Sequence, residues 1–434
     1  MVKKLFRICI KFNLTSIIAF VYYLKTSRFS KKKGKRFRLL ALNHNRFIED
    51  LKLLEKTGEF KIYKLPFDWQ SRFLNHFYNR EDRSSIGFKK INKVKQKIFR
   101  AFLKDFLFKY YRFLKVNCVI GASIHYKQDI DWGVVSAKIG IPYIVLHKEC
   151  LYASEGFIKQ FKIAMNHREK FNGTHAFVHN RVVKKTWLES NLIKKSNISV
   201  GGCMRMDDFI HTEKNIKKKF DLVFFSFAPG FPGLGGNISV TIFPKKNFPG
   251  FHNLSEKTHL EVILFAKNNP NLKVLIKPKW GGNWIKFIYD IAIKNGIEIE
   301  KIKNLQIDEK LNTHDVINSS KVFLGFNSSV LLEAAIKNKL VIIPIFEEAL
   351  KKEYKEYIFF RPYLKYFKVA NSKNKLSKII KEALSNNKSF SKTLKYRKQL
   401  FSDYISPISK KSVNFYKEKI KEIISKNSIY SEKR

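Results

Sequence analysis

The chain has 434 residues, of which 44% are hydrophobic and 15% aromatic, so it is not a disordered protein and is long enough for two folded domains. Its 85 Lys and Arg residues against 36 Asp and Glu residues give a formal net charge of +49, which favours anionic partners. Because the basic residues are spread over the whole length, we interpret the charge as favouring solubility and attraction to an anionic membrane surface. Nucleic-acid binding is the less favoured alternative, because no helix-turn-helix, RNP or zinc motif supports it.

Residues 12–24 form an uncharged, apolar segment between Lys11 and Lys25. The segment is shorter than the roughly 20 residues that a helix needs to span a bilayer. No small-residue cleavage site follows it, so a secretory signal is not predicted. Two interpretations of residues 1–35 stay open. One is a basic, apolar helix at an anionic membrane surface, and the other is a helix packed on the following domain.

Strands and helices alternate through residues 36–212, which predicts a domain with a parallel sheet covered on both faces. The predicted strands are 38–42, 60–65, 117–122, 142–146, 176–179 and 198–201. The predicted helices are 44–56, 91–114, 132–139, 157–168 and 182–188. Residues 68–90 have no clear period and are predicted to be an insertion or loop.

A charged linker at 213–219 marks the best domain boundary, and a second α/β domain is predicted over 213–375. Its predicted strands are 221–227, 272–276, 297–302, 321–326 and 340–345. Its predicted helices are 258–268, 283–294, 315–319 and 330–337. Residues 376–434 are predicted to be a basic helical segment of their own. The fold class that follows is α/β with two Rossmann-like domains.

The four cysteines, Cys9, Cys118, Cys150 and Cys203, lie far apart in the sequence and form no C-x-x-C pair. Neither a zinc site nor a disulfide framework is therefore predicted. Reduced thiols in a cytosolic compartment fit this usage best.

Three motifs follow one another through the last half of the chain. They are 201–209 (GGCMRMDDF), Lys277-Pro278, and 327–335 (NSSVLLEAA). They resemble the G-x-x-R-x-D-x-F, K-P-H-P and S-S-x-x-x-E-A motifs of GT-B glycosyltransferases that make bacterial surface polysaccharides, in particular the capsule and CDP-glycerol-transferase-like group. One departure is that Lys279-Trp280 stands where this group has His-Pro.

The resemblance implies two Rossmann-like domains facing a cleft, with 36–212 binding the acceptor and 213–375 the nucleotide-sugar. It implies an inverting glycosyltransferase without metal or cofactor that acts on a surface-glycan acceptor, including a lipid-linked one. The expected location is cytoplasmic, at the inner membrane. A CDP-linked polyol-phosphate transferase and a nucleotide-sugar 2-epimerase share this plan and stay as alternatives.

Donor binding needs groups that stabilise the negative charge of a pyrophosphate leaving group. Lys277 would supply a cation, Ser329 with the following helix would supply neutral donors, and Glu333 would accept from the ribose hydroxyls. Glycines in the loop 228–236 would let the backbone approach a phosphate. The predicted donor-binding residues are Lys277, Asn327, Ser328, Ser329, Glu333, Gly230 and Gly233.

The catalytic base is expected in the first domain, where polar residues follow predicted strands. Glu149 and His147 follow the strand 142–146 and rank first, ahead of Asp131 and His125, which follow the strand 117–122. At the domain junction, a pair of Arg205 with an aspartate, Asp207, is predicted to be structural. The adjacent carboxylates 207 and 208 do not have metal-ligand spacing, so no metal site is predicted.

Overall fold

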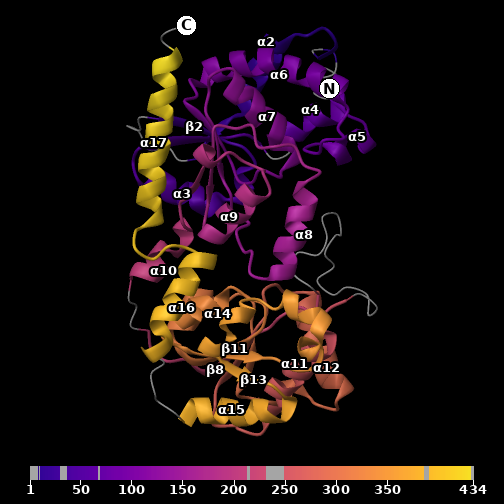
Figure 1. Ribbon diagram of the computed structural model, residues 1–434, viewed down its shortest axis with the longest axis vertical. Coiled ribbons are helices and arrows are strands. Elements are labelled where there is room, and N and C mark those ends of the chain that lie inside the picture. The colour runs from indigo at the N-terminus through magenta and orange to yellow at the C-terminus, as the bar shows by residue number, and fades with distance from the viewer. Residues whose placement is uncertain are drawn as a thin grey trace. The chain divides into compact units, whose positions relative to one another are not determined.

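The computed structural model describes residues 8, 10–29, 37–66, 69–212, 216–230, 249–385 and 391–431 (Figure 1). The chain divides into two α/β units. Unit 1 comprises Met1–Cys150, Lys162–His211 and Tyr404–Arg434, and unit 2 comprises Leu151–Phe161 and Thr212–Asp403. Each unit contains one sheet whose principal strands are parallel, which confirms the predicted class of two Rossmann-like folds.

The sheet of unit 1 has the strand order β1-β3-β2-β4-β5-β6-β7. Short β1 pairs antiparallel with β3, and the other pairs are parallel. The strands are β1 (Ser27–Arg28), β2 (Phe37–Ala41), β3 (Phe60–Lys64), β4 (Cys118–Gly121), β5 (Tyr143–Leu146), β6 (His175–Val178) and β7 (Ile198–Val200). The central strands are buried on both faces, as their continuous apolar sequences predict.

Helices cover the sheet of unit 1 on both sides (Figure 1). The helical elements of unit 1 are α2 (Thr15–Lys25), η1 (His44–Arg46), α3 (Ile48–Lys56), α4 (Trp69–Phe77), α5 (Arg80–Ser85), α6 (Lys93–Leu114), α7 (Lys127–Lys138), α9 (Arg181–Glu189), η2 (Lys195–Asn197), η3 (Met204–Met206), α10 (Asp207–His211) and α17 (Ser412–Ser431). The helix α8 (Glu155–Met165) begins in unit 2 and ends in unit 1. The C-terminal helix α17 places Tyr416 and Ile420 in the same apolar cluster as Leu51 of α3.

The prediction of a loop over 68–90 is wrong, because α4 and α5 form there. Trp69 and Phe73 lie one turn apart on α4 and are both buried. Their rings lie 4.7 Å and 5.2 Å from the ring of Tyr22 on α2. A short helix of this kind is stabilised by such tertiary contacts rather than by its own propensity, so the local pattern was too weak to show it.

The sheet of unit 2 has the strand order β10-β9-β8-β11-β12-β13, and all pairs are parallel. The strands are β8 (Phe220–Phe225), β9 (Val274–Lys277), β10 (Leu305–Ile307), β11 (Ser320–Gly325), β12 (Leu340–Pro344) and β13 (Lys368–Ala370). The helices are α11 (His252–Lys267), α12 (Asn283–Lys294), η4 (Ile299–Lys301), α13 (Thr313–Asn318), α14 (Val330–Ile336), η5 (Glu347–Leu350), η6 (Lys352–Tyr357), η7 (Arg361–Tyr366), α15 (Lys373–Ser385) and α16 (Ser391–Tyr404).

Two expectations about this half of the chain need correction. The predicted strand at 297–302 is the turn η4, and the strand β10 follows it. The alternation of isoleucine with charged residues suggested a strand, but a 3-10 turn also buries residues three apart, and here it buries Ile299 and Ile302. The predicted separate segment 376–434 is divided, because α15 and most of α16 belong to unit 2 whereas α17 belongs to unit 1.

Candidate functional site

The strand order defines where each unit can bind a ligand. In unit 2 the chain runs outward from β8 through β9 to β10 and then returns to β11 on the other side of β8. Ligands of open α/β sheets bind at such a switch point, outside the carboxyl ends of the two strands. In unit 2 this point lies between β8 and β11, and in unit 1 it lies between β2 and β4.

Glu333 lies on α14, directly after β11 at the switch point of unit 2. Its side chain is 4% exposed, and its two carboxylate oxygens have different partners. The hydroxyl of Ser329 donates to Oε1 at 3.3 Å, and Nε2 of His314 on α13 lies 3.2 Å from Oε2. His314 is 28% exposed, so it is the member of the pair that a ligand at this edge meets first.

The turn between β11 and α14 is held by Asn327, whose backbone has the left-handed φ of 47°. Its side-chain amide donates to the carbonyl of Tyr357 at 3.0 Å and accepts from the amide of Phe359 at 2.8 Å. Asn327 therefore fixes the turn, whereas the neighbouring Ser328 is only partly buried. Ser329 occupies the N-cap position of α14 but makes no side-chain cap bond, since its hydroxyl contacts Glu333 instead.

The end of β8 is fixed by a buried hydrogen-bond network around Ser226. Nε1 of Trp284 donates to Oγ of Ser226 at 2.6 Å, and Nε2 of His259 lies 2.6 Å from the same oxygen. Burial lowers the pKa of His259 to about 4, so the ring is neutral near pH 7. This network orients the loop that begins the predicted phosphate-binding segment.

Gly230 of this loop forms an isolated bridge with Gly250. A Cβ atom on Gly250 would lie 2.5 Å from the carbonyl oxygen of Pro229, so the close backbone approach requires glycine there. Gly233, the other predicted glycine, lies outside the described residues.

Two lysines lie at the carboxyl end of β9, the neighbour of β8: Lys277 is its last residue and Lys279 follows it. Lys277 is 6% exposed, and its Nζ donates to the carbonyl of Glu309 at 2.9 Å. Burial lowers the pKa of Lys277, and the same cause lowers the pKa of Lys279. Nζ of Lys279 lies 4.7 Å from the ring centroid of Trp280, which is half exposed. Cations held in place at a strand end are suited to binding a phosphate. The free-energy cost of removing the cations from water is offset when the negatively charged phosphate binds.

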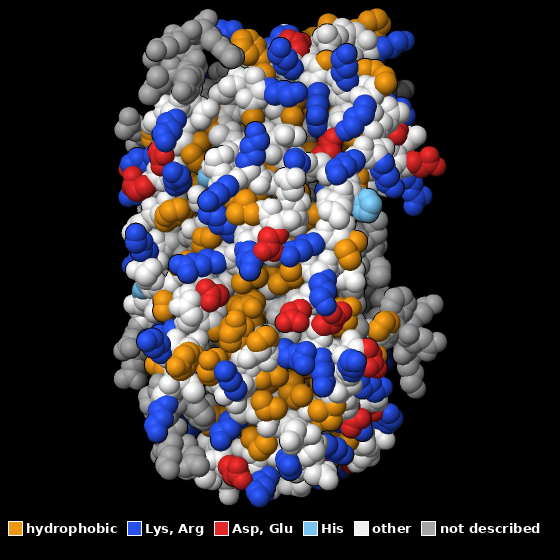
Figure 2. Space-filling model, viewed as in Figure 1, with side chains coloured by type: hydrophobic (Ala, Val, Ile, Leu, Met, Phe, Trp, Pro, Cys, Tyr) orange, Lys and Arg blue, Asp and Glu red, His pale blue; other side chains and the backbone are white. Residues whose placement is uncertain are grey.

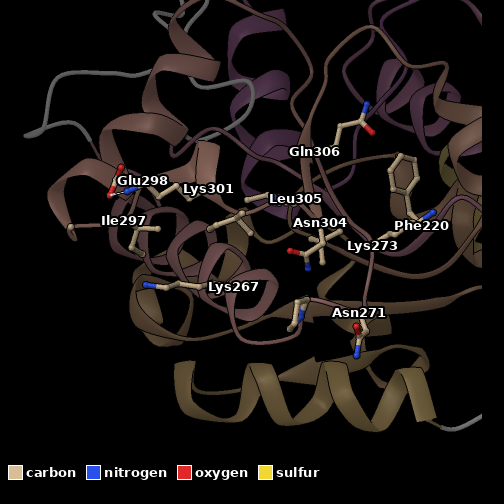
Figure 3. A pocket seen from close by; sticks show the side chains of 15 residues that line it. Phe220, Lys267, Asn271, Lys273, Ile297, Glu298, Lys301, Asn304, Leu305 and Gln306 are labelled. Carbon is tan, nitrogen blue, oxygen red and sulfur yellow. Dashed lines mark hydrogen bonds and ion pairs between the residues drawn. The ribbon is translucent and has the colours of Figure 1, made fainter.

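A cavity of about 640 Å³ lies at the opposite edge of this sheet (Figure 3). It is lined by the first residues of β8, β9 and β10, namely Phe220, Val274 and Leu305, and by surface lysines such as Lys267 and Lys273. The predicted donor-binding residues that the structure describes do not line it. The cavity therefore lies at one edge of the sheet and the predicted donor-binding residues at the other. In Figure 3 the amines of Lys267 and Lys273 point in different directions and do not converge on one point.

The switch point of unit 1 contains a half-buried histidine that the sequence did not single out as a candidate. His44 follows β2 directly, and burial lowers its pKa, with the charge of Lys64 adding to the effect. Its neighbour Asn43 donates to Oδ1 of Asp129 at 2.8 Å. Burial raises the pKa of Asp129, which is fully enclosed, to about 7.

The four predicted catalytic residues have different environments. Glu149 is exposed after β5, and the hydroxyl of Tyr126 donates to its Oε1 at 3.2 Å. His147 is 1% exposed, neither of its ring nitrogens has a partner with hydrogen-bond geometry, and its ring packs 4.7 Å from that of Trp187. Burial lowers the pKa of His147 well below its usual value and that of His125 to about 3. Of the four, Glu149 is the most exposed, His125 is partly exposed, and His147 and Asp131 are buried.

Asp131 is a structural residue in this fold. It is 1% exposed on α7, and Nε of Arg100 on α6 donates to its Oδ1 at 2.6 Å. The ion pair joins the two helices α6 and α7. The buried pairing does not favour Asp131 as a catalytic base, and that role stays a prediction.

The predicted pairing of Arg205 with Asp207 is wrong. Nε of Arg205 lies 3.3 Å from Oδ1 of Asp50, which is buried on α3. The two oxygens of Asp207 accept from the amides of Ser412 and Val413 at 2.8 Å each, where α17 begins. Asp207 therefore caps α17 and ties the C-terminal helix to unit 1, a partner that nearby sequence could not reveal.

No group of three or more His, Cys, Asp or Glu side chains is arranged to hold a metal ion in the part of the chain that the structure describes. Cys118, Cys150 and Cys203 are buried, and none of the three forms a disulfide.

The sequence matches no protein-family model and no curated protein. Solved structures similar to this chain include the UDP-GlcNAc 2-epimerase from Methanocaldococcus jannaschii (12% identity over 90% of this chain and 99% of that chain, TM-score 0.48). They also include the UDP-GlcNAc 2-epimerase from Neisseria meningitidis bound to UDP-GlcNAc (11%, 91% and 100%, TM-score 0.46) and a glycosyltransferase from Rickettsia africae ESF-5 (12%, 90% and 99%, TM-score 0.46). At these values the similarities carry no functional inference, so we infer the function of this chain from its own residues.

Proposed function

We propose that the chain is a nucleotide-sugar-dependent enzyme, and specifically a glycosyltransferase that extends a surface glycan. The observation that carries the proposal is the strand order of unit 2, because its switch point coincides with the residues that the sequence predicts for donor binding. Ser329, Glu333 and His314 are in contact there, and a loop with an obligatory close backbone approach follows the other strand.

In this proposal the nucleoside diphosphate lies along the carboxyl edge of β9, β8 and β11. The partly exposed ring of His314 and the carboxylate behind it hold the ribose, since a carboxylate that accepts two hydrogen bonds still has lone pairs for hydroxyl donors. Lys277 and Lys279 lie on the pyrophosphate side, where negative charge grows as the sugar leaves. Trp280 offers an exposed ring face at the same edge.

The acceptor would be deprotonated by a residue at the switch point of unit 1. His44 is suited to this role because its lowered pKa keeps the imidazole neutral near pH 7 and able to accept a proton. Glu149 is the second candidate, since its carboxylate is exposed at the same sheet edge. The acceptor is proposed to be lipid-linked, so transfer would take place at the cytoplasmic face of the inner membrane.

The first test is thermal stabilisation of the purified protein by CMP, CDP, UDP and GDP, alongside Glu333→Ala. A ligand that binds the folded state alone raises its stability by mass action, so one nucleotide should stand out and the variant should lose the effect. Glu298→Ala is the matched control, because Glu298 is an exposed glutamate at the opposite edge of the same sheet. A folded wild-type protein that responds to no nucleotide would overturn the proposal.

Transfer and epimerisation are separated by incubation with the nucleotide-sugar alone. A transferase without acceptor leaves the donor intact or releases free sugar slowly. A 2-epimerase changes the configuration at C2 of the bound sugar, which proton NMR detects directly. A CDP-linked polyol-phosphate transferase would instead be recognised by selective stabilisation with CDP and CMP.

A further inference from the structure

One face of unit 1 exposes large apolar side chains on two helices that pack together. We call it the apolar face, and it consists of Phe20 and Leu24 on α2 and Phe113 on α6. Between 44% and 62% of each side chain is exposed. The rings of Phe20 and Phe113 lie 6.0 Å apart, and Leu24 and Phe113 line one cavity, so the three side chains are contiguous. Aromatic side chains on an outer surface in this density are typical of an interaction site.

The helix α2 is a fixed part of unit 1 and not a detachable anchor. Its inner face buries Ile18 and Tyr22, and the hydroxyl of Tyr22 donates to the carbonyl of Trp69 at 2.9 Å. Removing α2 would expose this core, so only its outer side is available to a partner. In the described residues no helix is long and apolar enough to cross a membrane. For the described part of residues 1–35, the two interpretations are compatible, since α2 packs on the following domain and still presents apolar side chains outward.

Basic side chains lie along the same two segments of the chain. Nζ of Lys11 lies 5.8 Å from the ring centroid of Phe12, which precedes α2, and the guanidinium of Arg112 on α6 lies 5.6 Å from the ring centroid of Phe108. Lys25 ends α2 and is exposed. Figure 2 shows Lys and Arg side chains interspersed with hydrophobic ones on the face of the molecule in view. Long cationic side chains beside aromatic rings are suited to an interface between a hydrocarbon layer and anionic headgroups.

A cavity of about 340 Å³ opens beside the apolar face. Leu24 and Phe113 form part of its wall together with Arg28 and Arg38. The guanidinium of Arg38 is held in place, because NH1 donates to the carbonyl of Leu114 at 3.0 Å. Two guanidinium groups in a recess next to exposed apolar side chains match a phosphate whose acyl chains lie alongside.

We propose that this face of unit 1 docks on an anionic membrane, with the apolar face in the interfacial layer and a lipid phosphate in the cavity lined by Arg28 and Arg38. The charge of the surrounding lysines and arginines is what selects a lipid surface over a neutral protein partner. The inference deepens the proposed function, because it identifies how unit 1 would meet a lipid-linked acceptor. It does not depend on which reaction the enzyme performs.

The test is co-sedimentation of the full chain with vesicles of phosphatidylcholine alone and of phosphatidylcholine mixed with phosphatidylglycerol. Wild-type protein should bind the anionic vesicles and lose binding at high salt. The double variant Phe20→Ser with Leu24→Ser should lose affinity for the anionic vesicles by at least about tenfold, because two apolar side chains no longer insert. Arg28→Gln should weaken binding about fivefold, since one basic charge is removed from the surface.

Ile293→Ser is the matched control, because Ile293 is 72% exposed on α12 of unit 2 and loses a comparable apolar group there. It should bind vesicles like the wild type. Unchanged binding of the double variant, or equal binding of wild type to neutral vesicles, would overturn the docking surface. The nucleotide response of the same double variant is measured in parallel. A variant that keeps its nucleotide response but loses vesicle binding separates failure of the docking surface from failure of the proposed enzyme.

Discussion

Nε2 of His314 lies 3.2 Å from Oε2 of Glu333, and this contact joins the helices on either side of β11 at the switch point of unit 2. The carboxylate is buried and the imidazole is partly exposed. The pair therefore orients one exposed ring at the place where an open α/β sheet binds its ligand.

We expect the two side chains to act as a unit in nucleotide binding. Glu333→Gln and His314→Phe should each weaken binding by about tenfold, because the first removes the charge of the carboxylate acceptor and the second removes the hydrogen-bonding ring nitrogens. The double variant should be little weaker than either single variant, and a double-mutant cycle by calorimetric titration measures this coupling. Glu298→Gln is the control and should bind normally. Strictly additive losses would contradict the pairing.

The contiguous unit from β11 through α14 to β12 could be predicted from sequence, because each element has its own local signal. The Ser-rich turn before α14 and the apolar run at Leu340–Pro344 are close together in the sequence. Hydrophobic periodicity predicts such neighbouring elements best. The position of Glu333 followed from the same stretch. Its partner His314 did not, because the contact spans 19 residues and the helix predicted over 315–319 begins after His314, whereas α13 begins at Thr313.

Other parts of the fold are determined by contacts between distant segments. Asp207 accepts hydrogen bonds from Ser412 and Val413, which follow it in the sequence by 205 and 206 positions. No local pattern indicates partners at such a distance. Burial also changed the interpretation of the catalytic candidates. His147 and Glu149 are two residues apart after the same strand, yet one is enclosed and the other exposed. Sequence placed both at the sheet edge but could not say which of them faces solvent.

His44 is predicted to contribute to turnover. His44→Gln should lower kcat by about a hundredfold or more, because general-base catalysis by a side chain accounts for an acceleration of that order. Nucleotide stabilisation should be unchanged, since the nucleotide binds unit 2. The matched control is His76→Gln, an exposed histidine on α4. Loss of turnover in Glu149→Gln with normal turnover in His44→Gln would transfer the role to Glu149.

The buried carboxyl of Asp129 should make stability depend on pH in a defined direction. Burial raises its folded-state pKa to about 7, above the usual value of 3.8, so the folded protein holds a proton that the unfolded chain has released between these values. Stability should therefore fall as pH rises from about 4 to about 7, by an amount up to about 4 kcal/mol.

Asp129→Asn removes this titration while it keeps an oxygen that can accept from Asn43 and Gln70. The variant should become more stable relative to wild type as pH rises, and urea unfolding at several pH values measures the difference. Asp290→Asn, an exposed site on α12, should show no such trend. A constant difference between Asp129→Asn and wild type across this range would mean that the carboxyl titrates normally.

Asp207 should anchor the C-terminal helix to unit 1. Asp207→Ala removes the acceptor for the first amides of α17, and a lost cap costs about 1–2 kcal/mol. Because Tyr416 and Ile420 of α17 belong to the core of unit 1, fraying at the start of this helix should also raise hydrogen exchange at β6 and α3, which contribute to the same cluster. Asp208→Ala is the matched control, because Asp208 is the next residue in the sequence and its carboxylate is exposed. Equal unfolding free energies for the two variants would show that α17 is held by its apolar face alone and that the cap is dispensable.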